Sequence, residues 1–162
     1  MSIIDNLIYD RTQSDVDRVK ELSAKGLLSM TEAEKTEYLA GMKGAYNSSD
    51  LNRVAQAVAY LAERLLQHGT LAKVHAKTDW QMQDIPIVEQ MGAYLENLRA
   101  IRNAISVLAN TPSVPASMEK LSYTSANDME KMLKDIDTLI TKMGYAYRHT
   151  GMFYTGQGGL IA

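Results

Sequence analysis

The chain has 162 residues and no cysteine, and 17 Lys and Arg against 19 Asp and Glu leave a formal net charge of −2 at pH 7. The length suits one domain or a small core with an appended arm, and 46% hydrophobic residues are enough for a packed core. The lack of cysteine excludes disulfides, thiolate nucleophiles and cysteine-ligated zinc. The balanced charge argues against a nucleic-acid-binding surface, which needs clustered Lys and Arg.

The N-terminus reads MSIIDNLIYD and lacks the basic start of a signal peptide. The longest wholly apolar run, residues 57–62, is far shorter than the roughly 20 residues that span a bilayer. The sequence therefore predicts a soluble protein that is synthesised in the cytoplasm and does not associate with membranes.

Two helices are predicted in the first 45 residues. The first begins at Thr12 or Ser14, either of which can cap it, and ends at Gly26. The second begins at Thr31, where the sequence TEAE forms a capping box, and runs to about Lys43.

A third helix is predicted after the turn at residues 47–49, and it should end near Gln67. Its apolar residues recur at alternating steps of three and four: Leu51, Val54, Val58, Leu61 and Leu65. Such a heptad pattern is typical of helices that pack along one seam. Residues 69–85 show no clear period and are expected to form an irregular connector.

The longest helix is predicted to open at Asp84 and Pro86 and to end at Asn110. Its apolar residues recur at alternating steps of four and three: Ile87, Met91, Tyr94, Leu98, Ile101, Ile105 and Leu108. Three consecutive heptads fit self-association, and they also fit core packing within a monomeric bundle.

Pro112 and Pro115 bracket a short linker, after which a last helix is predicted to begin at Thr124 or Ser125 and to fray near Gly144. The final twelve residues, GMFYTGQGGLIA, contain four glycines, which argue against a helix. Exposed apolar residues on such a tail would be a liability. The tail is therefore expected to fold back on the core or to dock onto a neighbour.

These elements predict an all-α fold. It is a bundle of long heptad-patterned helices, either compact or extended into an arm, with a non-helical glycine-rich C-terminal tail. Three parts are expected: a helical domain at 1–110, a linker and final helix at 111–150 that pack on the bundle or on a neighbour, and a docking tail at 151–162.

No group of residues predicts catalysis. The three histidines are not spaced as zinc ligands, and the early aspartates lack the glycine and glutamate of a calcium loop. The glycines at 156–159 do not open a helix, as a phosphate-binding loop must. Arg53, Arg99 and Arg102 could reach partners or pair with nearby carboxylates. We expect no enzymatic activity, cofactor, metal, nucleic acid or small-molecule substrate.

Three blocks of sequence carry a resemblance. Ile4–Val16 reads IDNLIYDRTQSDV, Gly41–Val54 reads GMKGAYNSSDLNRV, and Met118–Leu133 reads MEKLSYTSANDMEKML. With the closing Gly151–Gly156, these blocks resemble a small family of tail-associated proteins of Firmicutes phages and prophages. The match spans most of the chain, but none of its blocks is a chemical motif.

The resemblance implies a tail-fibre, baseplate or minor structural protein of a virion, synthesised in the host bacterial cytoplasm. The implied partners are further copies of the chain and other tail or baseplate proteins. The expected interface residues are Ile87, Met91, Tyr94, Leu98, Ile101, Ile105, Phe153, Tyr154, Leu160 and Ile161. The alternative is a cytoplasmic, prophage-encoded helical adaptor or regulator that binds a protein partner.

Overall fold

The computed structural model describes residues 2–150, with side chains up to Ala146. This part of the chain contains five α-helices, two short 3-10 helices and no strand, which confirms the all-α class. The elements in chain order are η1 (Ile3–Asn6), α1 (Gln13–Lys25), η2 (Leu27–Ser29), α2 (Glu32–Leu39), α3 (Ser48–Gln67), α4 (Val88–Asn103) and α5 (Tyr123–Thr150).

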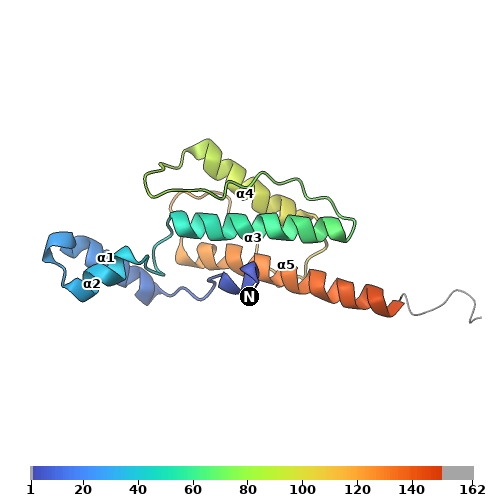
Figure 1. Cartoon of the computed structure of the whole chain (residues 1–162), viewed down its shortest axis with the longest axis horizontal. Helices are drawn as coiled ribbons and strands as arrows, with labels where there is room; N and C mark the ends of the chain where they lie inside the picture. The colour runs from blue at the N-terminus through green and yellow to red at the C-terminus, as the bar shows by residue number, and fades with distance from the viewer. Residues whose placement is uncertain (1, 151–162) are drawn as a thin grey trace, which may run out of the picture.

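Helices α3, α4 and α5 form the body of the molecule (Figure 1). Helix α3 packs against both α4 and α5, which also contact each other. The five heptad positions of α3 are all buried, and α5 contributes a second buried stripe: Met129, Met132, Leu133, Ile136 and Ile140. Each fully buried aliphatic side chain of this kind stabilises the fold by roughly 1.5–3 kcal/mol, so the body holds most of the stabilising apolar area.

Residues 2–11, which we call the strap, cross the body on α3 and α5. The 3-10 helix η1 contacts both helices, and Ile4 and Leu7 are buried in the common core. Ser2 and Asp5 cap this short helix reciprocally. The N-terminal segment is therefore part of the core and not a loose extension.

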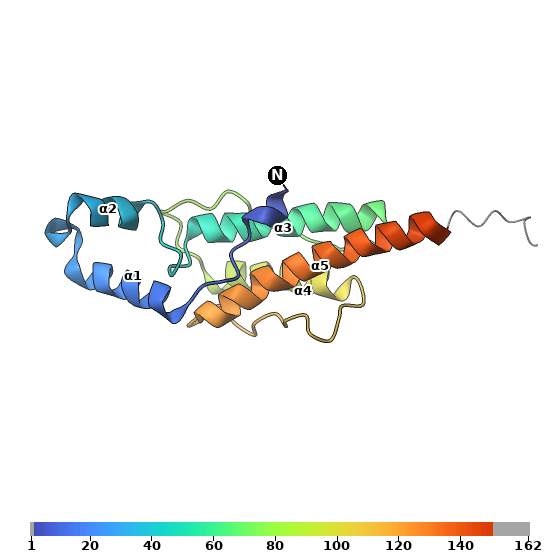
Figure 2. The same cartoon turned by 90° about the horizontal axis from the view of Figure 1, so that it is seen from below.

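Residues 12–40, which we call the arm, project from one end of the body as a helical hairpin (Figures 1 and 2). Only Leu22 and Met30 are buried within it. Two ion pairs join α1 to α2, Arg18 to Glu37 at 2.8 Å and Lys25 to Glu34 at 2.6 Å. Exposed ion pairs of this kind contribute little individually. With only two buried side chains, the hairpin has a small core of its own.

The predicted helix starts are confirmed at three capping boxes. Thr12 caps α1, Thr31 caps α2, and Asn47 caps α3. Helix α2 ends at Leu39, not at Lys43, because Gly41 adopts a left-handed backbone with φ of 88° and stops the helix. The connector at 69–85 contains neither helix nor strand, as predicted.

The prediction that the longest helix spans Pro86 to Asn110 is wrong. Helix α4 covers only Val88–Asn103, because the chain turns at Ala104 and Arg102 donates hydrogen bonds back to the carbonyls of Pro112 and Thr111. The longest helix is α5, with 28 residues. It runs through Gly144, so the predicted fraying there is also wrong. The helix can continue because glycine costs a helix interior only about 1 kcal/mol relative to alanine.

Gly44 lies where the arm meets the connection into α3. A Cβ atom at this position would stand 2.1 Å from the carbonyl oxygen of Asp15 and 2.6 Å from the backbone nitrogen of Val16. Both contacts are with backbone in the first turn of α1, so a side chain cannot be accommodated by a rotamer change. The close approach of these two segments therefore requires glycine.

We predict that Gly44→Ala lowers the free energy of unfolding by about 1–3 kcal/mol, because the first turn of α1 must move. Gly92→Ala is the matched control. Nothing lies within 4 Å of its Cβ position, and it is in the interior of α4, so it should raise stability by up to about 1 kcal/mol. Urea unfolding followed by circular dichroism measures both. Equal effects of the two substitutions would contradict the close packing at Gly44.

Candidate functional site

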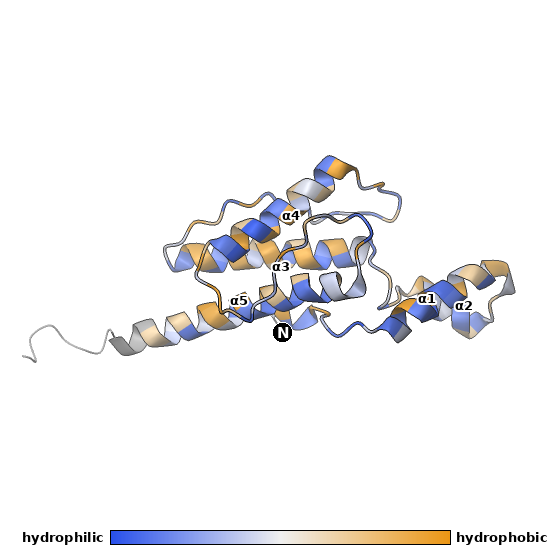
Figure 3. Ribbon diagram, turned by 180° about the vertical axis from the view of Figure 1, so that it is seen from behind, coloured by the Kyte–Doolittle hydropathy of each residue, from blue (hydrophilic) through white to orange (hydrophobic). Residues whose placement is uncertain are grey.

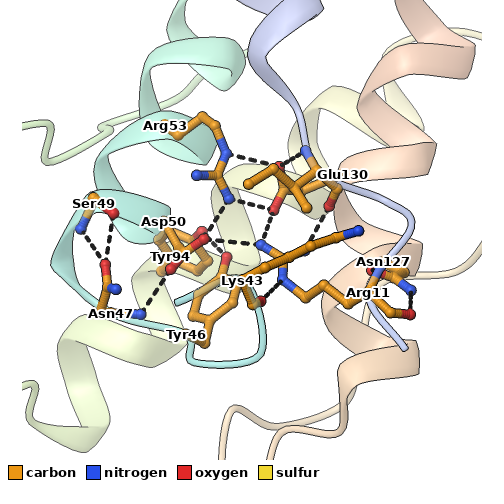
Figure 4. A network of polar contacts seen from close by, with 11 residues as sticks. Arg11, Lys43, Tyr46, Asn47, Ser49, Asp50, Arg53, Tyr94, Asn127 and Glu130 are labelled. Atoms are coloured by element: carbon orange, nitrogen blue, oxygen red, sulfur yellow. Dashed lines mark hydrogen bonds and ion pairs between the residues drawn. The ribbon is translucent and has the colours of Figure 1, made fainter. Parts of the chain in front are cut away.

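Four charged side chains meet in the body of the molecule, and we call them the charged network: Arg11, Asp50, Arg53 and Glu130 (Figure 4). Arg11 reaches Asp50 at 2.8 Å and Glu130 at 2.7 Å. Arg53 reaches Glu130 at 2.8 Å and also pairs with Asp50. Three of the four residues are buried, and two positive charges balance two negative ones.

Backbone groups add further hydrogen bonds to the charged network. The backbone N–H of Ile8 donates to Glu130 at 2.6 Å, and that of Asn47 donates to Asp50 at 2.9 Å. The guanidinium of Arg11 also donates to the carbonyl of Lys43 at 3.1 Å. A buried charge is tolerated only when it is paired and hydrogen-bonded. This arrangement meets both conditions and therefore suits a structural joint.

The protonation of Arg53 follows from the same contacts. Burial alone would lower the pKa of its guanidinium, but the hydrogen bonds and negative charges of Glu130 and Asp50 outweigh burial and raise that pKa above its ordinary value. Arg53 therefore stays charged, and it is not a group that exchanges protons at neutral pH.

Two tyrosines cover one side of the charged network. The guanidinium carbon of Arg11 lies 5.6 Å from the ring centroid of Tyr46, within cation–π range. The hydroxyls of Tyr46 and Tyr94 lie 2.8 Å apart, which joins the connection before α3 to α4. Burial raises the pKa of both phenols above the ordinary value of 10.0, and the nearby carboxylates of Glu130 and Asp50 add to this effect.

Three asparagines hold extended segments against the helices in the same way. In each case the side-chain amide accepts from the backbone N–H and donates to the backbone carbonyl of one residue. Asn127 of α5 holds Arg11 at 3.0 and 2.9 Å, and Asn52 of α3 holds Trp80 at 2.8 and 2.9 Å. Asn97 of α4 holds His75 at 2.8 and 3.1 Å. These pairs satisfy backbone groups that have no helical partner.

The charged network draws its members from the three sequence blocks described above. Arg11 comes from the first block, Asp50 and Arg53 come from the second, and Glu130 comes from the third. The sequence prediction missed this site, although one feature pointed to it. Glu130 is a charged residue between the buried positions Met129 and Met132, a place where an unpaired charge would be costly.

The arginines that could have reached partners are used within the chain. Arg53 belongs to the charged network, and Arg99 pairs with Glu96 at 2.6 Å and donates to the carbonyl of Pro115 at 2.9 Å. Arg102 holds the linker after α4 through the carbonyl of Pro112 at 3.0 Å. All three side chains thus stabilise this fold.

The expected interface residues in and beside α4 fall into three groups. Tyr94, Leu98 and Ile101 are buried in the chain's own core, and Met91 and Ile105 are partly buried against it. Ile87 is half exposed. The structure of a single chain does not test self-association, which stays a prediction. The buried side chains pack against other residues of the same chain. Phe153, Tyr154, Leu160 and Ile161 lie outside the described residues.

Large apolar side chains are exposed in several other places, and two of these places precede the middle of α4. One is the arm, where Leu28 is fully exposed and Leu27 and Leu39 are 47% and 72% exposed. The far end of the arm is accordingly coloured as hydrophobic in Figure 3. The other is the end of the connector and the start of α4, where Met82, Ile85 and Val88 are exposed.

Among the side chains described, those of residues 2–146, no cluster of three or more His, Asp or Glu could hold a metal ion. None of the described helices is both long enough and apolar enough to cross a membrane. Comparisons with family models, with curated proteins and with solved structures found no match to this chain.

We predict that Glu130→Gln lowers the free energy of unfolding by about 3–5 kcal/mol, because the buried Arg11 and the half-buried Arg53 would share one carboxylate. Glu32→Gln is the control. Glu32 pairs with Lys35, but its side chain is 90% exposed, so its loss should cost at most about 1 kcal/mol. Guanidinium chloride unfolding of both variants makes the comparison. Losses of similar size would show that the charged network does not support the fold.

A second prediction concerns alkaline pH. Above about pH 10 the unfolded chain releases the protons of Tyr46 and Tyr94, while the folded chain keeps them because both pKa values are raised. Their stabilising contribution is complete below pH 10. Above pH 10 the free energy of unfolding falls by up to about 1.4 kcal/mol per pH unit for each tyrosine. Urea unfolding between pH 8 and 11 should show a shallower decline for Tyr94→Phe than for the wild type. The same slope in both proteins would rule out this linkage.

Proposed function

We propose that this chain is a non-enzymatic structural protein that assembles through protein–protein contacts, as a part of a bacteriophage tail, baseplate or tail-like particle. The observation that carries the assembly role is the arm, which leaves the body and exposes Leu27, Leu28 and Leu39. The phage setting is supported by the resemblance of the three sequence blocks alone.

The arm is suited to reach a neighbouring molecule. Leu27 and Leu28 lie at the turn between α1 and α2, away from the body, so they add nothing to the chain's own core. Exposed leucines grouped in this way are typical of a contact surface for another protein. Its ionised side chains are largely paired with each other, as in Arg18 with Glu37 and Lys25 with Glu34, which leaves an apolar tip without strong charge.

The base of the arm gives this contact a fixed direction. Lys43 pairs with Asp10 at 2.9 Å, and Arg11 donates to the carbonyl of Lys43, so the segments that enter and leave the arm are tied together. Gly44 packs against the first turn of α1. Symmetric assemblies need contacts of defined geometry. The arm meets this requirement because the segments that enter and leave it are both fixed at its base.

The alternative is an adaptor that uses the same arm to bind one partner protein of a different kind. The exposed leucines favour both roles equally, and the two differ in whether copies of the chain bind each other. The mass of the isolated protein in solution separates them.

We predict that light scattering after size exclusion gives a mass above that of the 18.0 kDa chain. Three or six copies would match the symmetry of a tail component. Leu28→Asp should lower this mass without reducing helicity, because the side chain is fully exposed. Leu108→Asp, at an exposed leucine after α4, should leave the mass unchanged. A wild-type monomer at every concentration would contradict self-assembly and favour the adaptor.

A further inference from the structure

A cleft of about 570 Å³ lies between the first half of α4 and the linker that joins α4 to α5. Its lining is mainly apolar and includes side chains from α3, α4 and the linker: Leu51, Val88, Met91, Met118 and Leu121. Val88 is 89% exposed, and nothing lies within 4 Å of a Cβ atom placed on Gly92, which also lines the cleft. The α4 side of the cleft is therefore open to an apolar side chain from another molecule.

Two opposite charges stand beside this cleft. Glu119 lines it, and Lys120 lines an adjoining cleft of about 580 Å³ that shares Tyr46 and Leu121 with the first. Among the described side chains, neither Glu119 nor Lys120 has an ion-pair partner. An occupant of the cleft that carries one charge of each sign can therefore pair with both.

The tip of the arm carries the matching groups. Leu28 is fully exposed at the turn between α1 and α2, and α2 begins four residues later at Glu32. Glu32 is 90% exposed and pairs only with Lys35, one helical turn further on. The tip thus presents an apolar side chain next to one negative and one positive charge, which complements both the apolar lining and the two charges of the cleft.

The arm does not bring this tip to the chain's own cleft. The 13 residues of α1, about 20 Å of helix, separate the base of the arm from its tip. The arm points away from the body (Figures 1 and 2), whereas Tyr46 and Leu51 of the cleft follow the base of the arm directly in the chain. A tip that enters such a cleft therefore belongs to another copy.

We propose that the arm tip of one copy docks into this cleft of a second copy. Leu28 packs on the apolar lining, and Glu32 pairs with Lys120 of the other copy. Lys35 pairs with Glu119 in the same way. This inference rests on the proposed self-assembly and names the surface that receives the arm.

The position of the cleft also bears on how the assembly closes. Arm and cleft lie at the same end of the molecule, beside the starts of α3 and α5 (Figure 1). Each copy gives one arm and receives one, so copies that exchange arms gather around a common axis. Contacts of this kind close into a ring, whereas contacts at opposite ends of a molecule can build a filament.

Disulfide trapping tests the contact, because the chain has no cysteine of its own. Full-length Leu28→Cys and Val88→Cys, one of them carrying an affinity tag, are mixed in a glutathione redox buffer. Their mixed disulfide should exceed the share that random pairing gives. In the control mixture Leu108→Cys replaces Val88→Cys and should give no excess, because Leu108 is exposed but does not line the cleft.

The other outcomes separate the docking from self-assembly. An excess of the symmetric Leu28→Cys disulfide, or a random distribution, in a protein that still assembles would overturn the docking and leave self-assembly standing. A monomer in light scattering, with no disulfide in either mixture, would overturn both.

Charge reversal tests the pairing of Glu32 with Lys120. Glu32→Lys and Lys120→Glu should each raise the dissociation constant of the assembly by roughly three- to tenfold. The double variant should return to the wild-type value, because the pair is restored with its signs exchanged. Lys73→Glu, at an exposed lysine of the connector, is the matched control and should not rescue Glu32→Lys. Sedimentation at several concentrations measures the constants, and circular dichroism checks the folding of each variant. No recovery in the double variant, or equal recovery with Lys73→Glu, would refute this pairing.

Discussion

The pairing of two guanidiniums with two buried carboxylates is the constraint on which the rest of the structure depends. Arg11, Asp50, Arg53 and Glu130 come from the strap, α3 and α5, so one cluster fixes how three distant segments meet. Desolvating these charges is costly unless every partner is in place. If the strap were displaced, Asp50 and Glu130 would lose their ion pairs with Arg11. Alternative packings of this segment are therefore unfavourable.

The same cluster determines where the arm leaves the body. The chain enters the arm directly after Arg11 and returns through Lys43 and Gly44, and Arg11 binds the carbonyl of Lys43. Asn127 holds both backbone groups of Arg11 on α5. The hairpin can therefore have a small core of its own and still point in one direction, because its base is fixed by the body.

Features that depend on neighbouring residues could be predicted from the sequence. The caps at Thr12, Thr31 and Asn47 and the extent of α3 follow from local spacing, and the structure has them. Features that depend on distant residues could not. The end of α4 follows from the hydrogen bonds of Arg102 to the linker, and the continuation of α5 through Gly144 goes against a local preference. The charged network joins residues up to 119 positions apart, beyond the reach of any periodicity.

The sequence blocks and the proposed contact surface occupy different parts of the molecule. Ile4–Val16 and Gly41–Val54 supply the strap, the base of the arm and the start of α3, and Met118–Leu133 supplies Asn127 and Glu130. The tip of the arm, with Leu27 and Leu28, falls between the first two blocks. Its side chains are exposed and carry no part of the core, so the fold does not dictate them. The blocks therefore specify how the arm is held, whereas the proposed contact surface consists of residues that folding leaves unconstrained.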